Sequence, residues 1–323
     1  MHIASFRKWE ICNVEVHRLH TFGLGKIGYF FAIPAIKLLW RRIKPDIVHA
    51  HYVTSYGFLA AMAGVKPLIV TAWGSDVLLI PKRSFMMKWL ASFALHKANA
   101  VTMVAEHMTE SISSLGCPNE KCQAIPMGVN MRDFPFITRS MDVSGTIRLI
   151  STRSFEPIYN IETVIDAVRM AVADGVNLHL DLVGTGSLSA ALRQKVALAG
   201  LNDFVTFHGR VRFDKLRELL GESDIFISSS LSDGNNISLN EAMAMGCFPI
   251  ASDIPANSQW ICHGKNGLLF DAHKAENLTL MIKSALHRSD FESIAIANRR
   301  IVEEKANWEN CIRKMESLYY SLL

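Results

Sequence analysis

Two acidic residues bracket the start of an expected helix in the second half of the chain. Asp233 follows the serine-rich end of a strand, and Glu241 lies in the helix, with seven residues between them. The first turn of a helix has unpaired N–H groups and a positive dipole end, which favours an anion such as a diphosphate. A structural interpretation is also open: Glu241 could close a capping box with Ser238, and Asp233 could form a turn with Gly234.

The segments around these acids resemble glycosyltransferase family 4. The Asp233-x7-Glu241 spacing, followed by Ala-Met-Ala-Met-Gly, is similar to that family's acidic-x7-Glu signature. Further matching motifs follow in the expected order at residues 125–130, 183–186, 205–209, 249–253, 254–257 and 264–270. The resemblance implies an α/β protein of the GT-B class, in which two Rossmann-like domains with parallel sheets face each other across a cleft, and a retaining reaction.

The resemblance assigns the donor, a nucleotide diphosphate sugar, to residues of the second half. It implies that Glu241 accepts hydrogen bonds from the donor ribose and that Asp233, where most members have Glu, contacts the donor sugar. A carboxylate beside the sugar would also stabilise positive charge at the anomeric carbon. The backbone N–H groups of Gly234 to Ile237 would face the sugar or the phosphate. The remaining donor-site residues that the resemblance implies are Gly184, Gly209, Gly234, Asn235, Asn236 and Ile237.

Arg153 is the expected contact of the diphosphate, because a guanidinium binds phosphate oxygens in a bidentate way. Family members commonly have a Lys-Gly pair a few residues further on. This chain has Tyr159 and Asn160 there, and Tyr159 is counted as a donor-site residue. One cation is therefore absent where the leaving group gains charge. Arg153 could also be an ordinary surface charge. The sequence has no metal-binding Asp-x-Asp motif, so we expect no metal and no cofactor besides the donor substrate.

In the first half, two expected strand ends carry side chains able to contact an acceptor or handle a proton. His51 ends one strand, and Asp76 follows the next. An imidazole or a carboxylate there can act as a general base, so both are candidate catalytic residues. Each could instead be structural, as a single histidine in a loop more often is. Trp73 stands where many relatives have histidine, and could stack on a sugar ring or lie in the core.

The net charge of +4 is uneven, because residues 1–140 carry +8 and the remainder −4. Segments 29–44 and 81–97 interleave aromatic or apolar residues with Lys and Arg. Such segments are usually amphipathic helices that face the core, but in a basic domain they also suit an anionic membrane surface. The sequence shows no nucleic-acid-binding motif, so nucleic acid is not an expected partner.

Other features of the sequence indicate the cellular compartment in which the protein works. The chain has no signal-peptide pattern, no long uncharged apolar run and no Cys-x-x-Cys pair among its cysteines. These features favour a protein whose thiols stay reduced and which does not cross a membrane. We therefore expect a cytoplasmic protein that could also dock on the inner face of the cytoplasmic membrane.

Short apolar runs alternate with segments of helical length, which predicts buried parallel sheets. The expected strands are residues 2–5, 14–18, 46–50, 68–72, 100–104, 122–126, 147–151, 178–183, 204–208, 224–228, 247–251 and 267–270. We expect an N-terminal acceptor-side Rossmann-like domain at 1–140 and a nucleotide-sugar-binding Rossmann-like domain at 141–305. A C-terminal helix at 306–323 would pack back on the first domain.

Compared with the family pattern, the first strand, its Gly-rich turn and the following helix are expected to be absent. Residues 2–5 resemble the family's second strand and residues 14–18 its third. The strand that normally separates the second from the fourth would then be missing between residues 2–5 and 46–50. In a compact alternative, residues 2–5 themselves serve as the first strand, directly beside 46–50.

The resemblance implies a hexosyl-type transfer, with retention, from a nucleotide diphosphate sugar. By analogy with the family, the acceptor is a glycan or a lipid-linked glycan in surface polysaccharide assembly. Two other classes stay open. One is a nucleotide-sugar epimerase or phosphorylase on the same fold, and the other is a non-catalytic, truncated relative that binds a nucleotide without transfer.

Overall fold

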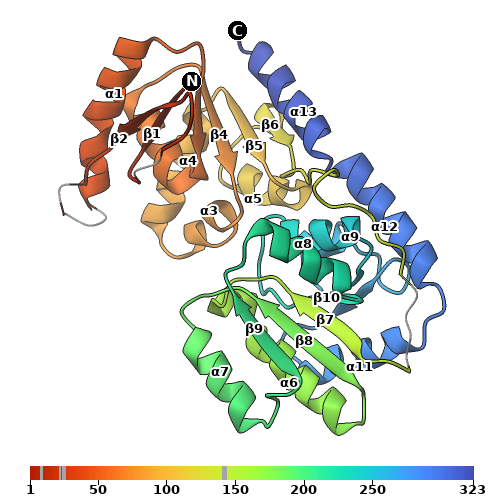
Figure 1. Ribbon diagram of the computed structural model, residues 1–323. Coiled ribbons are helices and arrows are strands. Elements are labelled where there is room, and N and C mark those ends of the chain that lie inside the picture. The colour runs from red at the N-terminus through yellow and green to blue at the C-terminus, as the bar shows by residue number, and fades with distance from the viewer. Residues whose placement is uncertain (8–9, 22, 24–26, 140–143) are drawn as a thin grey trace. The chain divides into compact units, whose positions relative to one another are not determined.

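The computed structural model describes residues 1–7, 10–21, 23, 27–139 and 144–323 (Figure 1). The chain divides into two compact units, the first comprising Met1–Ile125 with Arg313–Leu323 and the second Pro126–Ile312. Both units contain parallel sheets whose strands are separated by helices, as the alternating pattern predicts. No helix in the described part of the chain is long and apolar enough to cross a membrane.

The first unit is built on a four-stranded parallel sheet of order β3-β4-β5-β6. Its strands are β3 (Val48–His51), β4 (Leu68–Ala72), β5 (Ala100–Met103) and β6 (Cys122–Ala124). The accompanying helices are α1 (Ala32–Ile43), α2 (Phe58–Ala63), α3 (Ser75–Leu78), α4 (Phe85–Lys97) and α5 (Thr109–Ser114). Every residue of β4 and β5 is buried, as expected of parallel strands covered on both faces.

Strands β1 (His2–Ser5) and β2 (Glu15–Arg18) form a separate, two-stranded parallel sheet. Among the described residues β1 pairs with β2 alone, so the compact alternative, with residues 2–5 beside β3, is wrong. Ala4 and Phe6 pack against the core of the first unit. The Phe6 N–H also donates to the hydroxyl of Tyr56 at 3.3 Å. These contacts attach the strand pair to the rest of its unit.

The second unit contains a six-stranded parallel sheet of order β12-β11-β10-β7-β8-β9. Its strands are β7 (Ile147–Ser151), β8 (Leu178–Val183), β9 (Val205–Gly209), β10 (Ile225–Ser228), β11 (Phe248–Ser252) and β12 (Leu268–Phe270). The helices are α6 (Ile161–Ala173), α7 (Ser189–Leu198), α8 (Phe213–Glu222), α9 (Ile237–Ala244), α10 (Pro255–Ser258), α11 (Ala275–Leu286) and α12 (Phe291–Lys305). The last helix, α13 (Trp308–Tyr320), begins in this unit, and its residues from Arg313 onward group with the first unit. Successive strands run outward from β7 on one side and from β10 on the other, which is the Rossmann order.

Two hydrophobic cores lie on opposite faces of this sheet. Leu149 belongs to the core that includes residues of α6 and α11, whereas its neighbour Ile150 belongs to the core that includes residues of α9 and α12. Consecutive residues of a strand point to opposite faces, so both faces of β7 must be apolar. The central strands are therefore rigidly held, and the loops that follow them have fixed starting points.

The boundary between the units lies earlier than the expected residue 140. The reason is that the segment after Pro126 packs on the second unit, where Phe134 is part of the core. Arg139 is buried and donates to the carbonyl oxygens of Leu220 at 2.7 Å and Met245 at 3.3 Å. The C-terminal helix also differs from the expected 306–323, because α13 begins in the second unit and only Arg313–Leu323 group with the first.

Candidate functional site

The topology of the second unit identifies a place where a ligand can bind. The strand order reverses between β7 and β10, and ligands of open parallel sheets bind beyond the carboxyl ends of the strands at such a point. The loop after β7 carries Arg153, and the loop after β10 carries Asp233. Adjacent central strands thus bring together two predicted site residues that are distant in the sequence (Figure 1).

The guanidinium of Arg153 contacts three other predicted residues. Its Nη2 forms an ion pair with Asp233 Oδ2, and its Nη1 donates to Asn236 Oδ1 at 3.0 Å. The guanidinium carbon lies 4.3 Å from the centroid of the Tyr159 ring, a cation–π contact. Arg153 is only 8% exposed, so the interpretation as an ordinary surface charge is wrong. Its buried Nε has no hydrogen-bond partner in the described part of the chain.

Asn236 fixes the start of α9. Its Oδ1 accepts from the Leu239 N–H at 3.2 Å as well as from Arg153, which makes Asn236 the N-cap residue. Its Nδ2 donates to Ser228 Oγ at 2.9 Å and to Asn257 Oδ1 at 2.8 Å. Both amide hydrogens and both acceptor positions are therefore in use. The predicted site residue Asn236 thus orients Arg153 through its side chain.

Glu241 is not part of a capping box. The cap is Asn236, and the Ser238 hydroxyl donates instead to the Thr152 carbonyl at 3.4 Å. Among the described residues, no hydrogen bond or ion pair engages the Glu241 carboxylate. Desolvation by burial raises the pKa of Glu241 to about 7, and the positive charge of Arg153 opposes this rise. A carboxylate kept from water without a partner can readily accept hydrogen bonds from a ligand.

The predicted residues between Asp233 and the first turn of α9 differ in burial and in hydrogen-bond partners. Gly234, Asn235 and Asn236 are buried, and Ile237 is half-buried. The Ile237 N–H already donates to the Asn235 carbonyl at 3.0 Å, so the prediction that it faces the ligand is not supported. Asn235 Oδ1 accepts from Trp260 Nε1 at 3.2 Å, while its buried Nδ2 has no partner among the described residues. Trp260 has a positioning role that no sequence motif indicated.

The glycines after β8 allow two loops to approach closely. A Cβ on Gly184 would lie 2.3 Å from the Arg153 carbonyl oxygen, and one on Gly186 would lie 2.4 Å from that of Phe155. The Gly184 N–H donates to the Gly209 carbonyl at 2.9 Å, and Gly209 has a φ of +66°. Gly184 therefore acts on Arg153 through packing. A direct donor contact of Gly184 or Gly209 stays a prediction.

Replacing Gly184 by alanine is expected to weaken nucleotide binding about tenfold, because the added methyl group must displace the Arg153 backbone and a small misplacement is costly in a binding site. Titration calorimetry would measure the change. Gly200→Ala is the control, since Gly200 also has a positive φ, +68°, but its Cβ would meet nothing within 4 Å. Equal affinities of the two variants would contradict the packing role.

Tyr159 and Asn160 stand where family members commonly have Lys and Gly, so this chain has an aromatic ring where the family has a second cation. Asn160 has a φ of +51°, the left-handed conformation in which asparagine is the most tolerated residue after glycine. The Ser229 hydroxyl donates to the carbonyls of Tyr159 at 2.8 Å and Asn160 at 2.9 Å, so the turn is fastened to the loop after β10. Tyr159 thus supports Arg153 with an aromatic face where the family has a second cation.

A cavity of about 460 Å³ opens next to this turn. It is lined by residues that follow β10, β11 and β12, among them Leu231, Asp253 and Asp271. The Leu231 N–H donates to the Ile158 carbonyl at 2.8 Å, and the Asn160 side chain donates to the carbonyl of Ala272, another lining residue, at 2.7 Å. The cavity therefore adjoins the Arg153 cluster.

Asp76 and His51 belong to the first unit. Asp76 is fully buried, and its carboxylate accepts the N–H groups of Val53 at 2.8 Å, Trp73 at 3.0 Å and Gly74 at 2.9 Å. Desolvation raises its pKa, while these bonds act in the opposite direction. Asp76 therefore holds two loops together, and its burial argues against the predicted acceptor contact or proton transfer.

His51 remains accessible, and its ring stacks on His49 with centroids 4.3 Å apart. Desolvation lowers the pKa of His51, which keeps the imidazole neutral near pH 7 and able to accept a proton. His49, which no motif singled out, contacts the Tyr319 hydroxyl at 2.7 Å and Thr71 Oγ1 at 2.5 Å. Burial, together with His51, lowers the pKa of His49 to about 3. These contacts give His49 a structural role.

The two units have close counterparts among solved structures. Anabaena Alr3699/HepE, solved in complex with UDP and glucose, matches with a TM-score of 0.78 and 17% identity over 96% of this chain and 86% of that chain. Sucrose-phosphate synthase (tll1590) from Thermosynechococcus elongatus matches with a TM-score of 0.79 and 19% identity over 98% and 85%. These proteins share the GT-B fold, and the chain has that fold as the sequence predicts.

Sequence comparison then defines the family. Residues 140–308 match Glycosyl transferases group 1, and residues 5–105 match Glycosyl transferase 4-like. The chain belongs to the glycosyl transferases group 1 and is a glycosyltransferase.

Several curated relatives are similar over much of the chain. N-acetyl-alpha-D-glucosaminyl L-malate synthase of Bacillus anthracis is 26% identical over 294 residues, 86% of this chain and 75% of that protein. The amylovoran biosynthesis glycosyltransferase AmsK of Erwinia amylovora is 25% identical over 314 residues, 93% and 77% respectively. A putative colanic acid biosynthesis glycosyltransferase, WcaL of Salmonella typhimurium, is 26% identical over 221 residues, 65% and 54%.

Proposed function

We propose that this chain transfers a hexosyl-type sugar, with retention, from a nucleotide diphosphate sugar to a glycan or lipid-linked acceptor in surface polysaccharide assembly. The observation that carries the donor part is the cluster of Arg153, Asp233 and Glu241 at the switch point of the second sheet. It supplies a cation for a diphosphate and a carboxylate for ribose hydroxyls, next to the N-terminus of α9. A protein of the same fold binds UDP and glucose.

The chemistry of transfer separates the sugar from a leaving diphosphate. Arg153 and the backbone N–H groups that precede α9, at Gly234, Asn235 and Asn236, would stabilise the charge on the departing diphosphate, without a metal. Asp233, in contact with Arg153, would face the sugar and stabilise positive charge at the anomeric carbon. With retention, the acceptor oxygen forms its bond on the face that the diphosphate leaves, and the proton of the acceptor hydroxyl passes to the departing diphosphate oxygen. His51 stays a candidate acceptor contact, on the basis of its accessibility and lowered pKa.

The acceptor class is supported by the relatives. Two of them are named for amylovoran and colanic acid biosynthesis, which are polysaccharides. Since relatives of this family also act on other acceptors, such as the L-malate of the Bacillus anthracis synthase, the experiment must test several classes. We place the glycan or lipid-linked glycan first among them.

A panel of nucleotide sugars, incubated with and without candidate acceptors, tests this function. We expect acceptor-dependent release of a nucleoside diphosphate, and proton NMR coupling constants of the product that show the same anomeric configuration as the donor. An inverted product would contradict retention. Isomerisation of the donor without acceptor, or a sugar phosphate formed with inorganic phosphate, would identify an epimerase or a phosphorylase. Nucleotide binding without any transfer would identify a non-catalytic relative.

Donor affinity is expected to depend on pH through Glu241. Its pKa of about 7 means that the carboxyl is mostly protonated at pH 6, whereas ribose hydroxyls bind the ionised form. The affinity for a nucleotide sugar, whose diphosphate does not titrate in this range, should therefore rise about tenfold from pH 6 to pH 8. Titration calorimetry at several pH values measures this rise. Glu241→Gln should bind more weakly at pH 8 and show a flat profile.

The stability of the ligand-free protein gives an independent control for the same residue. Because burial raises the folded-state pKa of Glu241 above its usual 4.5, its ionisation lowers the free energy of unfolding as pH rises towards 7. Glu241→Gln should therefore be more stable than the parent by about 1–3 kcal/mol at pH 8 and lose this advantage near pH 5. If Glu241→Gln is less stable than the parent at pH 8, the Glu241 carboxylate must have a bonding partner in the folded protein, which would contradict the structure.

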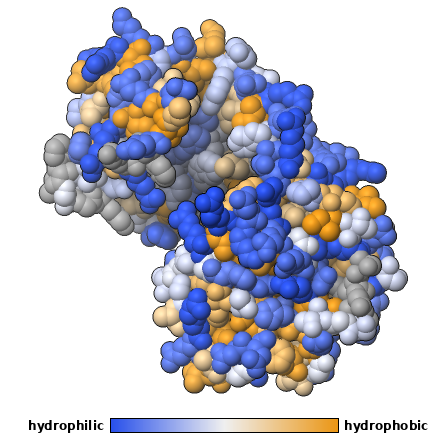
Figure 2. All heavy atoms as spheres, viewed as in Figure 1, coloured by the Kyte–Doolittle hydropathy of each residue, from blue (hydrophilic) through white to orange (hydrophobic). Residues whose placement is uncertain are grey.

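We also propose that the first unit docks on an anionic membrane. Exposed apolar side chains gather on and next to α1 and α4, namely Phe30, Phe31, Leu38, Phe85, Met86 and Trp89. Phe58 of α2 links α4 with the turn that precedes α1, because its ring centroid lies 5.9 Å from that of Trp89 and 6.0 Å from that of Phe30. Exposed cations alternate with these residues: Lys37, Arg41, Arg42, Lys82, Arg83 and Lys88. Figure 2 shows apolar and hydrophilic side chains interleaved on the visible face of this unit.

Co-sedimentation with vesicles that contain anionic lipid tests the docking surface. Binding is expected at low ionic strength and should fade with added salt. Arg83→Ala should weaken it about fivefold, since one cation near the surface contributes about 1 kcal/mol. Leu198→Ala, which changes an 82% exposed apolar residue of the second unit, is the control and should bind as the parent does. Failure to sediment at low salt would exclude the membrane contact.

A further inference from the structure

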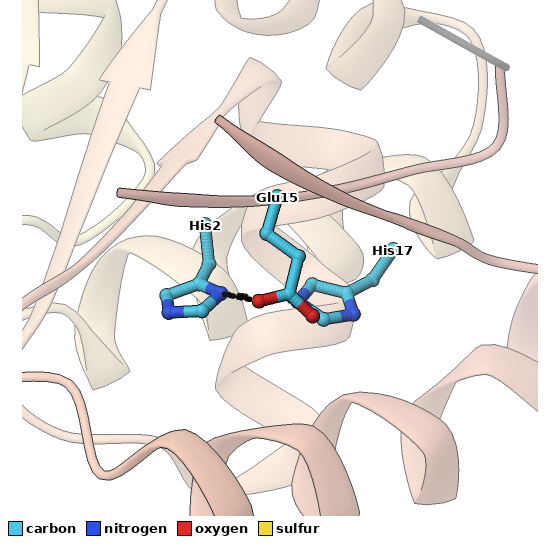
Figure 3. Close-up of side chains that lie close together, drawn as sticks. All are labelled: His2, Glu15 and His17. Carbon is cyan, nitrogen blue, oxygen red and sulfur yellow. Dashed lines mark hydrogen bonds and ion pairs between the residues drawn. The ribbon is translucent and has the colours of Figure 1, made fainter. Parts of the chain in front are cut away.

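The strand pair β1–β2 places three metal-ligating side chains on one face. In the parallel register His2 lies opposite Glu15, and Ala4 lies opposite His17. Residues two apart on a strand point to the same side, so Glu15 and His17 share a face, and His2 joins them from the neighbouring strand. Figure 3 shows the Glu15 carboxylate next to the His2 and His17 imidazole rings. Fifteen positions separate the two histidines, so no local motif reveals the group.

The distances between the three groups are close to those within a tetrahedral coordination shell, and they involve both oxygens of the Glu15 carboxylate. His2 Nδ1 lies 3.3 Å from Glu15 Oε2 and 3.2 Å from His17 Nε2, and His17 Nε2 lies 3.6 Å from Glu15 Oε1. Zinc bonds to imidazole nitrogen and carboxylate oxygen measure about 2.0–2.2 Å, which at tetrahedral angles separates ligand atoms by about 3.3–3.6 Å. One ion could therefore reach all three groups with little movement of the side chains.

We propose that His2, Glu15 and His17 bind a divalent transition-metal ion of the zinc class. Two neutral imidazoles and one carboxylate are the mixed nitrogen and oxygen ligand set that zinc accepts, with water in the remaining position. The side chains of His2, Glu15 and His17 are 39%, 65% and 22% exposed, so an ion can reach them from solvent. In the described part of the chain, this is the one group of three such residues with suitably close ligand atoms.

A bound ion would stabilise the pairing of β1 with β2, because its ligands come from both strands. Each strand has four residues, and a two-stranded sheet of that length is only marginally stable. A ligand that binds the paired form alone shifts the equilibrium towards pairing. The site is separate from the donor residues, all of which belong to the second unit. The expectation that sugar transfer itself needs no metal is unaffected.

Metal binding can be measured on the full chain, prepared without a histidine tag and treated with a chelator. Cobalt(II) is the spectroscopic probe, since tetrahedral cobalt absorbs visible light far more strongly than the hexaaqua ion. We expect one cobalt ion per chain, displaced by zinc, with slower amide hydrogen exchange in β1 and β2 when the ion is bound. His17→Gln should abolish the absorption band. His96→Gln changes an exposed histidine of the same unit outside the site and should leave the band unchanged.

Two results would overturn the proposal. One is a cobalt band of equal strength in the parent and in His17→Gln. The other is no saturable binding by the parent, which would mean that the three side chains form a hydrogen-bonded cluster only. Glu15→Gln keeps both imidazoles and removes the charge, so a variant that folds normally and binds at least tenfold more weakly supports the ligand set. Nucleotide binding by these variants should be normal, which separates this test from that of the donor site.

Discussion

Replacing Arg153 by alanine is expected to weaken nucleotide diphosphate binding between tenfold and more than a hundredfold. The guanidinium is buried and is held in place by Asp233, Asn236 and the Tyr159 ring, so it is ordered before a ligand arrives. A charge-assisted hydrogen bond contributes about 1.5–3 kcal/mol, which corresponds to that range of affinity. Calorimetry with nucleoside diphosphates measures the loss.

The controls for this prediction separate binding from folding. Arg153→Ala leaves the Asp233 carboxylate without its buried cation, and a loss of stability can follow. Arg153→Lys keeps the charge but not the planar group that stacks on Tyr159, and should bind about tenfold more weakly while staying folded. Arg193→Ala removes another guanidinium of the same unit, stacked 4.5 Å from the Phe207 ring, and should leave affinity unchanged. Normal affinity in a folded Arg153→Ala protein would refute the diphosphate contact.

Replacing Asp233 by asparagine is expected to lower kcat about a hundredfold or more. The change removes the negative charge that we propose to lie next to the anomeric carbon and keeps the size of the side chain, so we expect the loss to fall on the transition state. Nucleoside diphosphate affinity should stay near normal or rise slightly, because Arg153 would no longer share its charge with a carboxylate. Steady-state kinetics combined with product-inhibition constants distinguish the two effects.

The contrast with the Arg153 variants makes this test specific. A turn residue alone would give unchanged turnover, since asparagine forms the same turns as aspartate. A residue needed mainly to orient Arg153 would give weaker nucleotide binding instead of slower transfer. Asp233→Asn should therefore affect kcat, and Arg153→Lys should affect binding.

Much of the fold follows from local sequence patterns. The twelve expected strands correspond in order to β1 through β12, with ends shifted by two residues or fewer. Strand β4, for example, is a short apolar, β-branched run that begins directly after Pro67, and such runs are buried on both faces in parallel sheets. The boundary lies earlier than residue 140, and the sequence could not place it because a strand-free segment has no periodicity. The burial of Phe134 and the hydrogen bonds of Arg139 show which unit the segment joins.

The sequence predicted which residues belong to the candidate site, but not which of them contact one another. The family motifs named Arg153 and Asp233, yet eighty positions separate them, and their ion pair depends on the adjacency of β7 and β10. Local rules allowed a capping box at Ser238 as readily as a cap at Asn236. Ser228 at the end of β10 and Asn257 in α10 decide between these caps, because both accept hydrogen bonds from the Asn236 amide.

In the first unit, residue type alone was a poor guide to role. A carboxylate after a strand is compatible with catalysis, but Asp76 accepts three backbone N–H groups that no pattern in the sequence identifies. The His2, Glu15 and His17 group was missed for a related reason. Its ligands are far apart along the chain, and only the parallel register of β1 and β2 brings them together.

The buried pair of Arg153 and Asp233 has a consequence for selectivity in the crowded solution of a cell. A cationic pocket open to solvent would be occupied by chloride, phosphate and metabolite carboxylates, all of which are abundant. Here Arg153 already has an anionic partner in direct contact, so an incoming anion must compete with it. A single carboxylate or chloride offers no advantage over Asp233. A diphosphate carries several acceptor oxygens and can bind Arg153 and the start of α9 at once, so we expect small anions to be poor competitors of the donor.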